Sequence, residues 1–202
     1  MEYKEILNTN ITLLFSEPLN HLLITFKDLV DLFKIGDEKL DQHSFIEAPG
    51  LKVLIFPNRQ KELIFEANRI LINDKSKKEP QNSEVVDYLE KILQKNKMVD
   101  RNKIIAYGFN YDIIGTSEKG KVEDFISSKI KEAVENIKSA GVNLVFEKDT
   151  SRQVLQITPH ATPNQFLIHL NIHYQRPLEE LITIKEKLNN DFINFLELIK
   201  KI

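Results

Sequence analysis

The sequence predicts an α+β fold, with a largely antiparallel sheet and helices packed on one of its faces. Short alternating stretches occur in closely spaced pairs joined by polar loops, as in β-hairpins. Apolar stripes with helical spacing are set apart from these pairs, which is typical of α+β proteins. Because 42% of the 202 residues are hydrophobic, the chain can bury a sizeable core. We expect the element order βαββα-βαβββα.

The elements of the first half follow from apolar spacing and turn residues. Residues 11–15 form a short apolar run that predicts a strand, and large apolar residues recur every three or four positions over 18–36, which predicts a helix. Two extended stretches, 52–56 and 61–73, are predicted to pair as a hairpin around a polar loop. Ser83 is predicted to cap a short helix.

The second half repeats this alternation of strand and helix signals. Aromatic and aliphatic residues occupy every second position of its first stretch, which is the period of a half-buried strand. The expected elements are a strand at 105–113, a helix at 121–140, strands at 142–147, 153–158 and 165–174, and a helix from Pro177 to the C-terminus.

We expect a single domain over residues 1–202. The segment 98–102 is the one credible internal boundary, and it would divide the chain into subdomains 1–97 and 98–202. Each part would then contain a strand, a helix, a hairpin and a terminal helix. A diverged duplication is therefore a second interpretation, although no residue-level repeat supports it.

Charge and composition argue against several classes of function. The 28 basic and 30 acidic residues nearly cancel, so nucleic acid is an unlikely partner. The sequence has no cysteine, which excludes thiolate metal sites and cysteine nucleophiles. No apolar run approaches the roughly 20 residues of a membrane-spanning helix, and the acidic N-terminus does not resemble a signal peptide. We expect a cytoplasmic protein with no membrane contact, no metal and no cofactor.

The segment from Gly115 to Lys121 matches most of a phosphate-binding loop, G-x-x-x-x-G-K. However, Val122 stands where that motif needs a hydroxyl for magnesium, and Glu118 would place a carboxylate beside the phosphates. The preceding strand is amphipathic, whereas the strands of nucleotide-binding sheets are buried on both faces. We interpret the segment as a polar turn.

Aromatic residues at 107, 109 and 111 share one face of a predicted strand. They could stack with nucleic-acid bases, but such platforms normally lie in a basic groove, and few cations flank this strand. Packing in the core is the better interpretation.

The polar row His169, Asn171 and His173 is the best candidate for a ligand-contacting surface. On a helix the two histidines would lie one turn apart and could bind a metal ion with His160, but the segment alternates as a strand does. Their Cα atoms would then lie about 13 Å apart, which is too far for one zinc ion. We add Asp112 as a further candidate, and Arg69, which could bind an anion or pair with a carboxylate across the sheet.

The last helix is the candidate oligomer interface. Its apolar stripe is wide enough to make contacts on more than one side, and twofold dimers are the commonest closed assembly. The residues expected at the interface are Leu181, Leu188, Phe192, Phe195 and Ile199. A single deeply buried core helix is the alternative.

The sequence contains no complete catalytic constellation. We therefore expect a non-catalytic, homo-oligomeric binding or assembly module that presents a polar sheet surface or groove to an unknown protein partner. The alternative is an enzyme or small-molecule-binding protein with a pocket between sheet and helices, because catalytic groups often come from distant segments of a chain.

Overall fold

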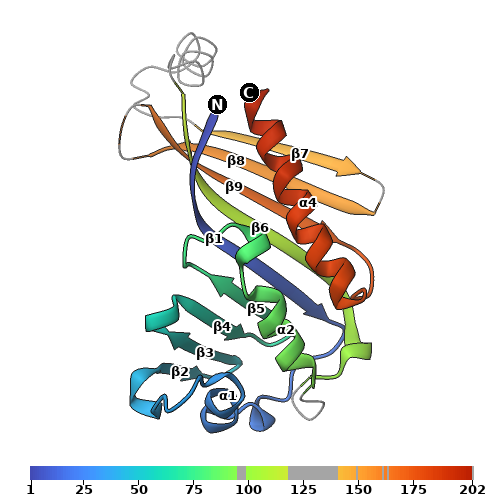
Figure 1. Cartoon of the computed structure of the whole chain (residues 1–202). Coiled ribbons are helices and arrows are strands. Elements are labelled where there is room, and N and C mark those ends of the chain that lie inside the picture. The colour runs from blue at the N-terminus through green and yellow to red at the C-terminus, as the bar shows by residue number, and fades with distance from the viewer. Residues whose placement is uncertain (95–98, 118–140, 149, 161, 163, 202) are drawn as a thin grey trace.

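The structure is a computed structural model that describes every residue except 95–98, 118–140, 149, 161, 163 and 202. The described residues form one nine-stranded antiparallel sheet with the strand order β2-β3-β4-β5-β1-β6-β9-β8-β7, and three α-helices (Figure 1). The predicted α+β class with a largely antiparallel sheet is confirmed.

The sheet is built symmetrically around its two central strands. The strands are β1 (Glu2–Phe15), β2 (Ser44–Ala48), β3 (Leu51–Phe56), β4 (Lys61–Phe65), β5 (Arg69–Asp74), β6 (Ile104–Thr116), β7 (Val142–Lys148), β8 (Ser151–Pro159) and β9 (Gln165–Tyr174). β1 pairs with β6 at the centre. A meander β3-β4-β5 returns to pair with β1, and a meander β7-β8-β9 returns to pair with β6.

The described helices lie on the same face of the sheet (Figure 1). They are α1 (Phe26–Phe33), α2 (Val85–Gln94) and α4 (Leu181–Lys200). Thr25 begins α1 because its hydroxyl accepts a hydrogen bond from the Asp28 amide at 3.1 Å, which satisfies one of the free amides of the first turn. None of the described helices is both long and apolar enough to cross a membrane.

The aromatic residues of β6 lie in the core between the sheet and α4. Tyr107, Phe109 and Tyr111 are 1%, 0% and 0% exposed. The Tyr111 hydroxyl donates a hydrogen bond to the Leu188 carbonyl at 2.7 Å, which connects β6 to α4. The prediction of core packing at these three positions is confirmed.

A buried ion pair joins the sheet to the start of α2. Lys61 Nζ lies 2.7 Å from Asp74 Oδ2, with the two side chains 2% and 1% exposed. Ser83, which precedes α2, donates to the same carboxylate at 2.7 Å, and its oxygen lies 3.4 Å from the Val85 amide of the first turn. Burial opposes ionisation of Asp74, but the hydrogen bonds from Lys61 and the serines outweigh it and lower its pKa.

Two predicted elements are wrong in their boundaries. The stretch 61–73 is two strands, β4 and β5, because the chain turns at Glu66, whose amide donates to the Arg69 carbonyl at 2.8 Å. This turn changes the side-chain alternation, so that Phe65 and Ile70 pair with each other and both enter the core. The predicted helix over 18–36 is shortened to α1.

β1 was only partly predicted and β2 was not predicted. Together with the division of 61–73, this gives the first half two strands more than the expected order βαββα. β1 extends far beyond 11–15 toward the N-terminus, where bulges interrupt its pairing with β6 and blur the alternation of its side chains. β2 is mostly exposed and lacks an apolar face that would predict a strand. In contrast, β9 has the predicted bounds 165–174.

The residues predicted for an oligomer interface are largely used within the chain. Leu188, Phe192, Phe195 and Ile199 are 1%, 3%, 1% and 1% exposed, and Leu181 is partly buried against the same core. The four buried side chains pack against the sheet, so they are not on the surface for a second copy to contact. The exposed apolar side chains of α4 are Ile182 and Ile193.

The predicted helix over 121–140 lies outside the described residues, and so do Glu118, Lys121 and Val122 of the segment that resembles a phosphate-binding loop. Gly115 is described and lies near the end of β6.

Candidate functional site

The five residues predicted to contact a ligand all lie on one surface, the sheet face away from α1, α2 and α4, which we call the open face. On β9, His169, Asn171 and His173 alternate with side chains that are buried in the core. Asp112 on β6 pairs in register with His169, and Arg69 on β5 alternates with the buried Ile70. These residues therefore cannot line a pocket between the sheet and the described helices, as the alternative prediction required.

Four asparagines and one glutamate form a hydrogen-bonded row across five strands of the open face. We call this the asparagine row, and its members in order are Asn171 on β9, Asn110 on β6, Asn10 on β1, Asn73 on β5 and Glu62 on β4. Each Nδ2 donates to the oxygen of the next member, at 2.5, 2.6, 2.8 and 3.1 Å in that order. The register of four strand pairs thus brings these five side chains into one hydrogen-bonded chain.

Glu62 fixes the direction of the asparagine row. An ionised carboxylate can only accept hydrogen bonds, so Asn73 must turn its Nδ2 toward Glu62 and its Oδ1 toward Asn10, and the same orientation passes along the row. Lys75 Nζ holds the carboxylate at 2.8 Å. Asn10 and Asn73 are only 2% and 8% exposed, so water competes little for these bonds.

The row ends at Asn171, beside a shallow hollow. In register with Asn171 on the next strand is Val154, which cannot continue the amide chain. The hollow has a volume of about 320 Å³, and it is lined by Thr12, Leu14, Arg69, Leu71, Tyr107, Gly108, Asn110, Asn171 and His173. Besides Arg69, it combines neutral hydrogen-bonding groups with two leucines.

Gly108 keeps the hollow open. It pairs with His173 on β9, and a Cβ built on it would lie 2.6 Å from the Ile172 carbonyl oxygen, which is closer than real Cβ atoms approach. A side chain is therefore excluded here for steric reasons, and the floor of the hollow is backbone.

Asp112 and His169 form a second polar contact on the open face. His169 Nδ1 lies 2.7 Å from Asp112 Oδ1, and Asn8 donates to Asp112 Oδ2 at 3.1 Å. Because the Asp112 carboxylate accepts this hydrogen bond, His169 carries a proton on Nδ1. Burial opposes ionisation of Asp112, but the hydrogen bonds from His169 and Asn8 lower its pKa overall.

Arg69 is paired with a carboxylate within its own hairpin. Its Nε donates to Glu66 Oε2 at 2.6 Å, across the turn between β4 and β5. The charge of its guanidinium is therefore largely balanced before any ligand arrives.

Aliphatic side chains surround the polar centre of the open face. They occupy the positions that alternate with core residues, and they are Leu14, Ile46, Ile55, Ile64, Leu71, Val145, Val154 and Leu167, all at least partly exposed. Ile46 and Val145 are 52% and 51% exposed. The open face thus mixes aliphatic side chains with polar ones, and the strip of amides crosses its middle.

The sequence did not identify Asn10, Asn73, Asn110 or Thr12 as site residues. Each stands in a strand whose polar positions were visible, but only the register of β1 with β5 and β6 brings them into one row. His160, considered with the other histidines, lies after β8, and among the described residues no three His, Asp or Glu side chains lie together as a metal site.

No protein-family model and no curated protein matches this sequence. Among solved structures, the chain is similar to one titled Methanococcus jannaschii TBP, with 12% identity and a TM-score of 0.32 over 98% of each chain. A similarity this weak supports no inference about this protein.

Proposed function

We propose that the protein is a non-catalytic binding module that holds a segment of a partner protein on its open face. The observation that carries this proposal is the asparagine row, which holds the partly exposed amides of Asn110 and Asn171 in one fixed direction beside the hollow over Gly108. Amides that are already oriented lose little freedom when a ligand binds.

The groups of the open face favour binding over catalysis. A nucleophile must be hydrogen-bonded to a base that activates it. The hydroxyl in the hollow belongs to Thr12, and it donates to Asn10 Oδ1 at 2.8 Å instead of to a histidine. The imidazole of His169 is hydrogen-bonded to Asp112.

The chemistry of the open face fits a protein segment better than a polyanion. Its charged groups are balanced in pairs, Arg69 with Glu66, Glu62 with Lys75 and Asp112 with His169, and Arg152 lies in register with Glu147 on the neighbouring strand, so the open face offers no unbalanced field to a phosphate backbone. Partly exposed aliphatic residues around oriented polar groups resemble the interiors of protein interfaces. The hollow of about 320 Å³ is at the small end of ligand pockets, which suits one or two side chains of a partner.

Three further expectations belong to the same proposal. A homodimer through α4 would use the exposed Ile182 and Ile193 instead of the buried residues of that helix. The chain is expected to be a single domain, because one sheet runs through both 1–97 and 98–202, and to be cytoplasmic. The alternative is a small-molecule site between sheet and helices, and it would use a different set of residues from the five on the open face.

The asparagine row also favours a diverged duplication. Asn10 on β1 pairs in register with Asn73 on β5, and Asn110 on β6 pairs in register with Asn171 on β9. Asn10 and Asn110 also pair with each other. The four asparagines are therefore arranged symmetrically about the centre of the sheet, as expected if both halves derive from one ancestral unit. In aligned relatives, the four positions should then change together.

Selection of peptides from a random library displayed on phage tests the proposed function. Enriched peptides should bind the purified wild-type chain and lose affinity for Leu71→Glu and for His173→Glu, which alter the edge of the hollow at partly exposed positions. Ile182→Glu on α4 is the matched control and should bind normally. Failure to enrich any peptide, or equal affinity for the open-face variants, would refute the proposal.

A further inference from the structure

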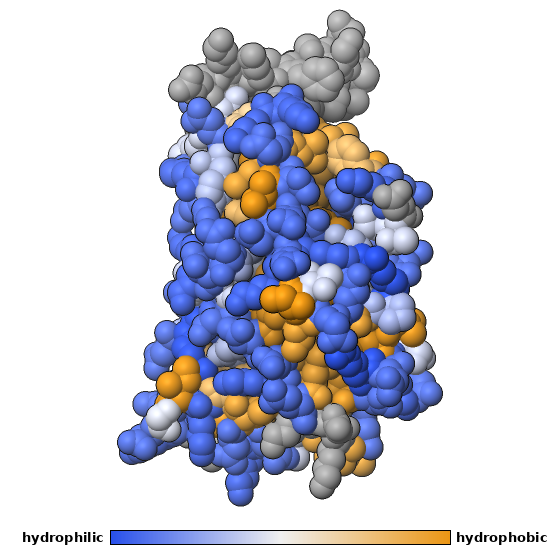
Figure 2. Space-filling model, turned by 45° about the vertical axis from the view of Figure 1, so that its right-hand side comes forward, coloured by the Kyte–Doolittle hydropathy of each residue, from blue (hydrophilic) through white to orange (hydrophobic). Residues whose placement is uncertain are grey.

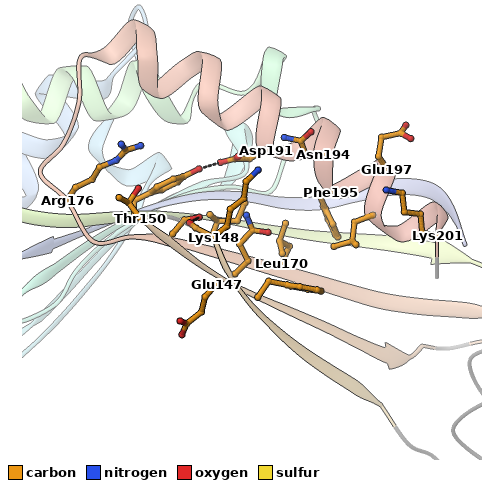
Figure 3. A pocket seen from close by; sticks show the side chains of 16 residues that line it. Glu147, Lys148, Thr150, Leu170, Arg176, Asp191, Asn194, Phe195, Glu197 and Lys201 are labelled. Atoms are coloured by element: carbon orange, nitrogen blue, oxygen red, sulfur yellow. Dashed lines mark hydrogen bonds between the residues drawn. The ribbon is translucent and has the colours of Figure 1, made fainter.

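A trough of about 880 Å³ lies on the helical side of the sheet, between α4 and strands β7 and β8. Figure 3 shows its walls, with Asp191, Asn194 and Lys201 on the side of α4 and Lys148 on the side of β7. Because it is on the opposite face of the sheet from the asparagine row, the trough is independent of the proposed function.

The floor of the trough is apolar. Leu170, Ile172 and Phe195 are each 1% exposed and form its base, while Phe146 and Leu198 are partly exposed on its two sides. Figure 2 shows hydrophobic surface between hydrophilic rims on the side of the molecule that carries α4. A ligand would therefore bury an apolar body here.

The rim of the trough carries an excess of positive charge. Lys148 and Lys201 line it, and neither forms an ion pair with a carboxylate of the described residues. Of the acidic residues at the rim, Glu197 is paired with Lys200 at 2.6 Å. Glu147 points away from the trough in Figure 3.

Asp191 is the remaining acidic group of the rim, and the two lysines outnumber it. It accepts a hydrogen bond from the Tyr174 hydroxyl at 2.5 Å (Figure 3). Burial raises the pKa of Asp191 in spite of that bond. Arg176 lies over the other side of this tyrosine, with its Cζ 5.2 Å from the ring centroid, but it is paired with Glu179 at 3.5 Å and adds no net charge at this end of the trough.

We propose that the trough binds an organic anion with an apolar body, of which a free fatty acid is the simplest example. The hydrocarbon lies along the trough over Phe146, Leu170 and Leu198, and the carboxylate pairs with a lysine at one end of the rim, Lys148 or Lys201. Charge complementarity selects an anion over a cation of the same shape. The proposal does not depend on any partner of the open face.

Isothermal titration calorimetry with dodecanoate, kept below its micelle concentration, tests this site on the full chain. Wild type should bind dodecanoate, and the cation dodecyltrimethylammonium should bind at least tenfold more weakly. The variant Lys148→Glu/Lys201→Glu should lose affinity for dodecanoate by about tenfold, since an exposed ion pair contributes up to about fivefold. Both lysines are exposed, so this variant is expected to fold, and its thermal unfolding checks that.

Lys185→Glu is the matched control, since Lys185 is exposed on α4 and does not line the trough; its affinity for dodecanoate should equal that of wild type. Absence of binding to wild type would overturn the proposal. Equal binding of the cationic detergent, or unchanged affinity in the double variant, would show that the rim does not select an anion and would also overturn it.

Discussion

Replacing Asn10 with alanine removes the central member of the asparagine row. Asn10 accepts hydrogen bonds from Asn110 Nδ2 at 2.6 Å and from the Thr12 hydroxyl at 2.8 Å, and it donates to Asn73 Oδ1 at 2.8 Å. The substitution therefore breaks these three hydrogen bonds, together with a longer one from Nδ2 to the Ile72 carbonyl at 3.4 Å, and divides the row into two parts. We expect a loss of stability that exceeds the loss from any exposed asparagine of the same sheet.

The magnitude follows from burial. A hydrogen bond contributes about 1 kcal/mol net, so three bonds correspond to about 3 kcal/mol. Asn110 and Thr12 are partly exposed and can be hydrated after the change, whereas Asn73 is 8% exposed and would keep a poorly solvated oxygen, which adds to the loss. For a chain of this length, about 3 kcal/mol lowers the melting temperature by about 6 to 12 °C.

Urea denaturation of four variants measures the effect and its origin. The series is Asn10→Ala, Asn110→Ala, the double variant, and Asn143→Ala, which alters an exposed asparagine of β7. The Asn10/Asn110 cycle should give a coupling of about 1 kcal/mol, and Asn143→Ala should stay within about 0.5 kcal/mol of wild type. A loss below about 1 kcal/mol for Asn10→Ala, with no coupling, would show that the side chains of the row are not hydrogen-bonded to one another in solution.

Three other predictions concern the sheet and its core. Asp74→Asn should cost about 3 kcal/mol because it removes the buried counter-ion of Lys61, which keeps only the more exposed Glu84 at 3.2 Å. The pKa of Asp74 is lowered in the folded state, so its stabilising contribution is complete at neutral pH and is lost as the pH falls through the folded-state pKa; urea midpoints from neutral pH to about pH 3 should decline less in Asp74→Asn, and parallel declines would contradict this. Phe109→Ala should cost about 3 to 5 kcal/mol because this side chain is fully buried. A cost near zero in the same assay would show that Phe109 is exposed on the surface. Gly108→Ala should cost about 1 to 3 kcal/mol because its Cβ would meet the Ile172 carbonyl. An unchanged melting temperature would show that the backbone of β9 can shift away from this Cβ at little cost in free energy.

The sequence predicted those parts of the fold in which a single strand or helix carries its own pattern. β9 was predicted with its correct bounds because its side chains alternate without interruption, and this placed His169, Asn171 and His173 on one face. The turn at Glu66 was missed, since polar residues are tolerated within a strand and only the pairing of β4 with β5 shows that the chain reverses there. Such pairing is a property of two segments together.

The candidate site was half predicted for the same reason. Asp112 and Arg69 were named from their chemistry, but their partners in the structure, His169 and Glu66, depend on which strands are neighbours. Asn10 and Asn110 are far apart in the chain, and nothing local distinguishes them from other strand asparagines. The buried residues of α4 were assigned to an interface because a wide apolar stripe does not show which neighbour covers it.

The central position of β1 has a consequence for synthesis in the cell. β1 finds one neighbour, β5, soon after it is made, but its other edge stays unpaired until β6 has been made, since Asn10 pairs with Asn110. An unpaired edge strand is a template for association with other chains, and long-range pairing of this kind slows folding. The ribosome-bound chain would therefore benefit from a chaperone that shields this edge until the second half emerges.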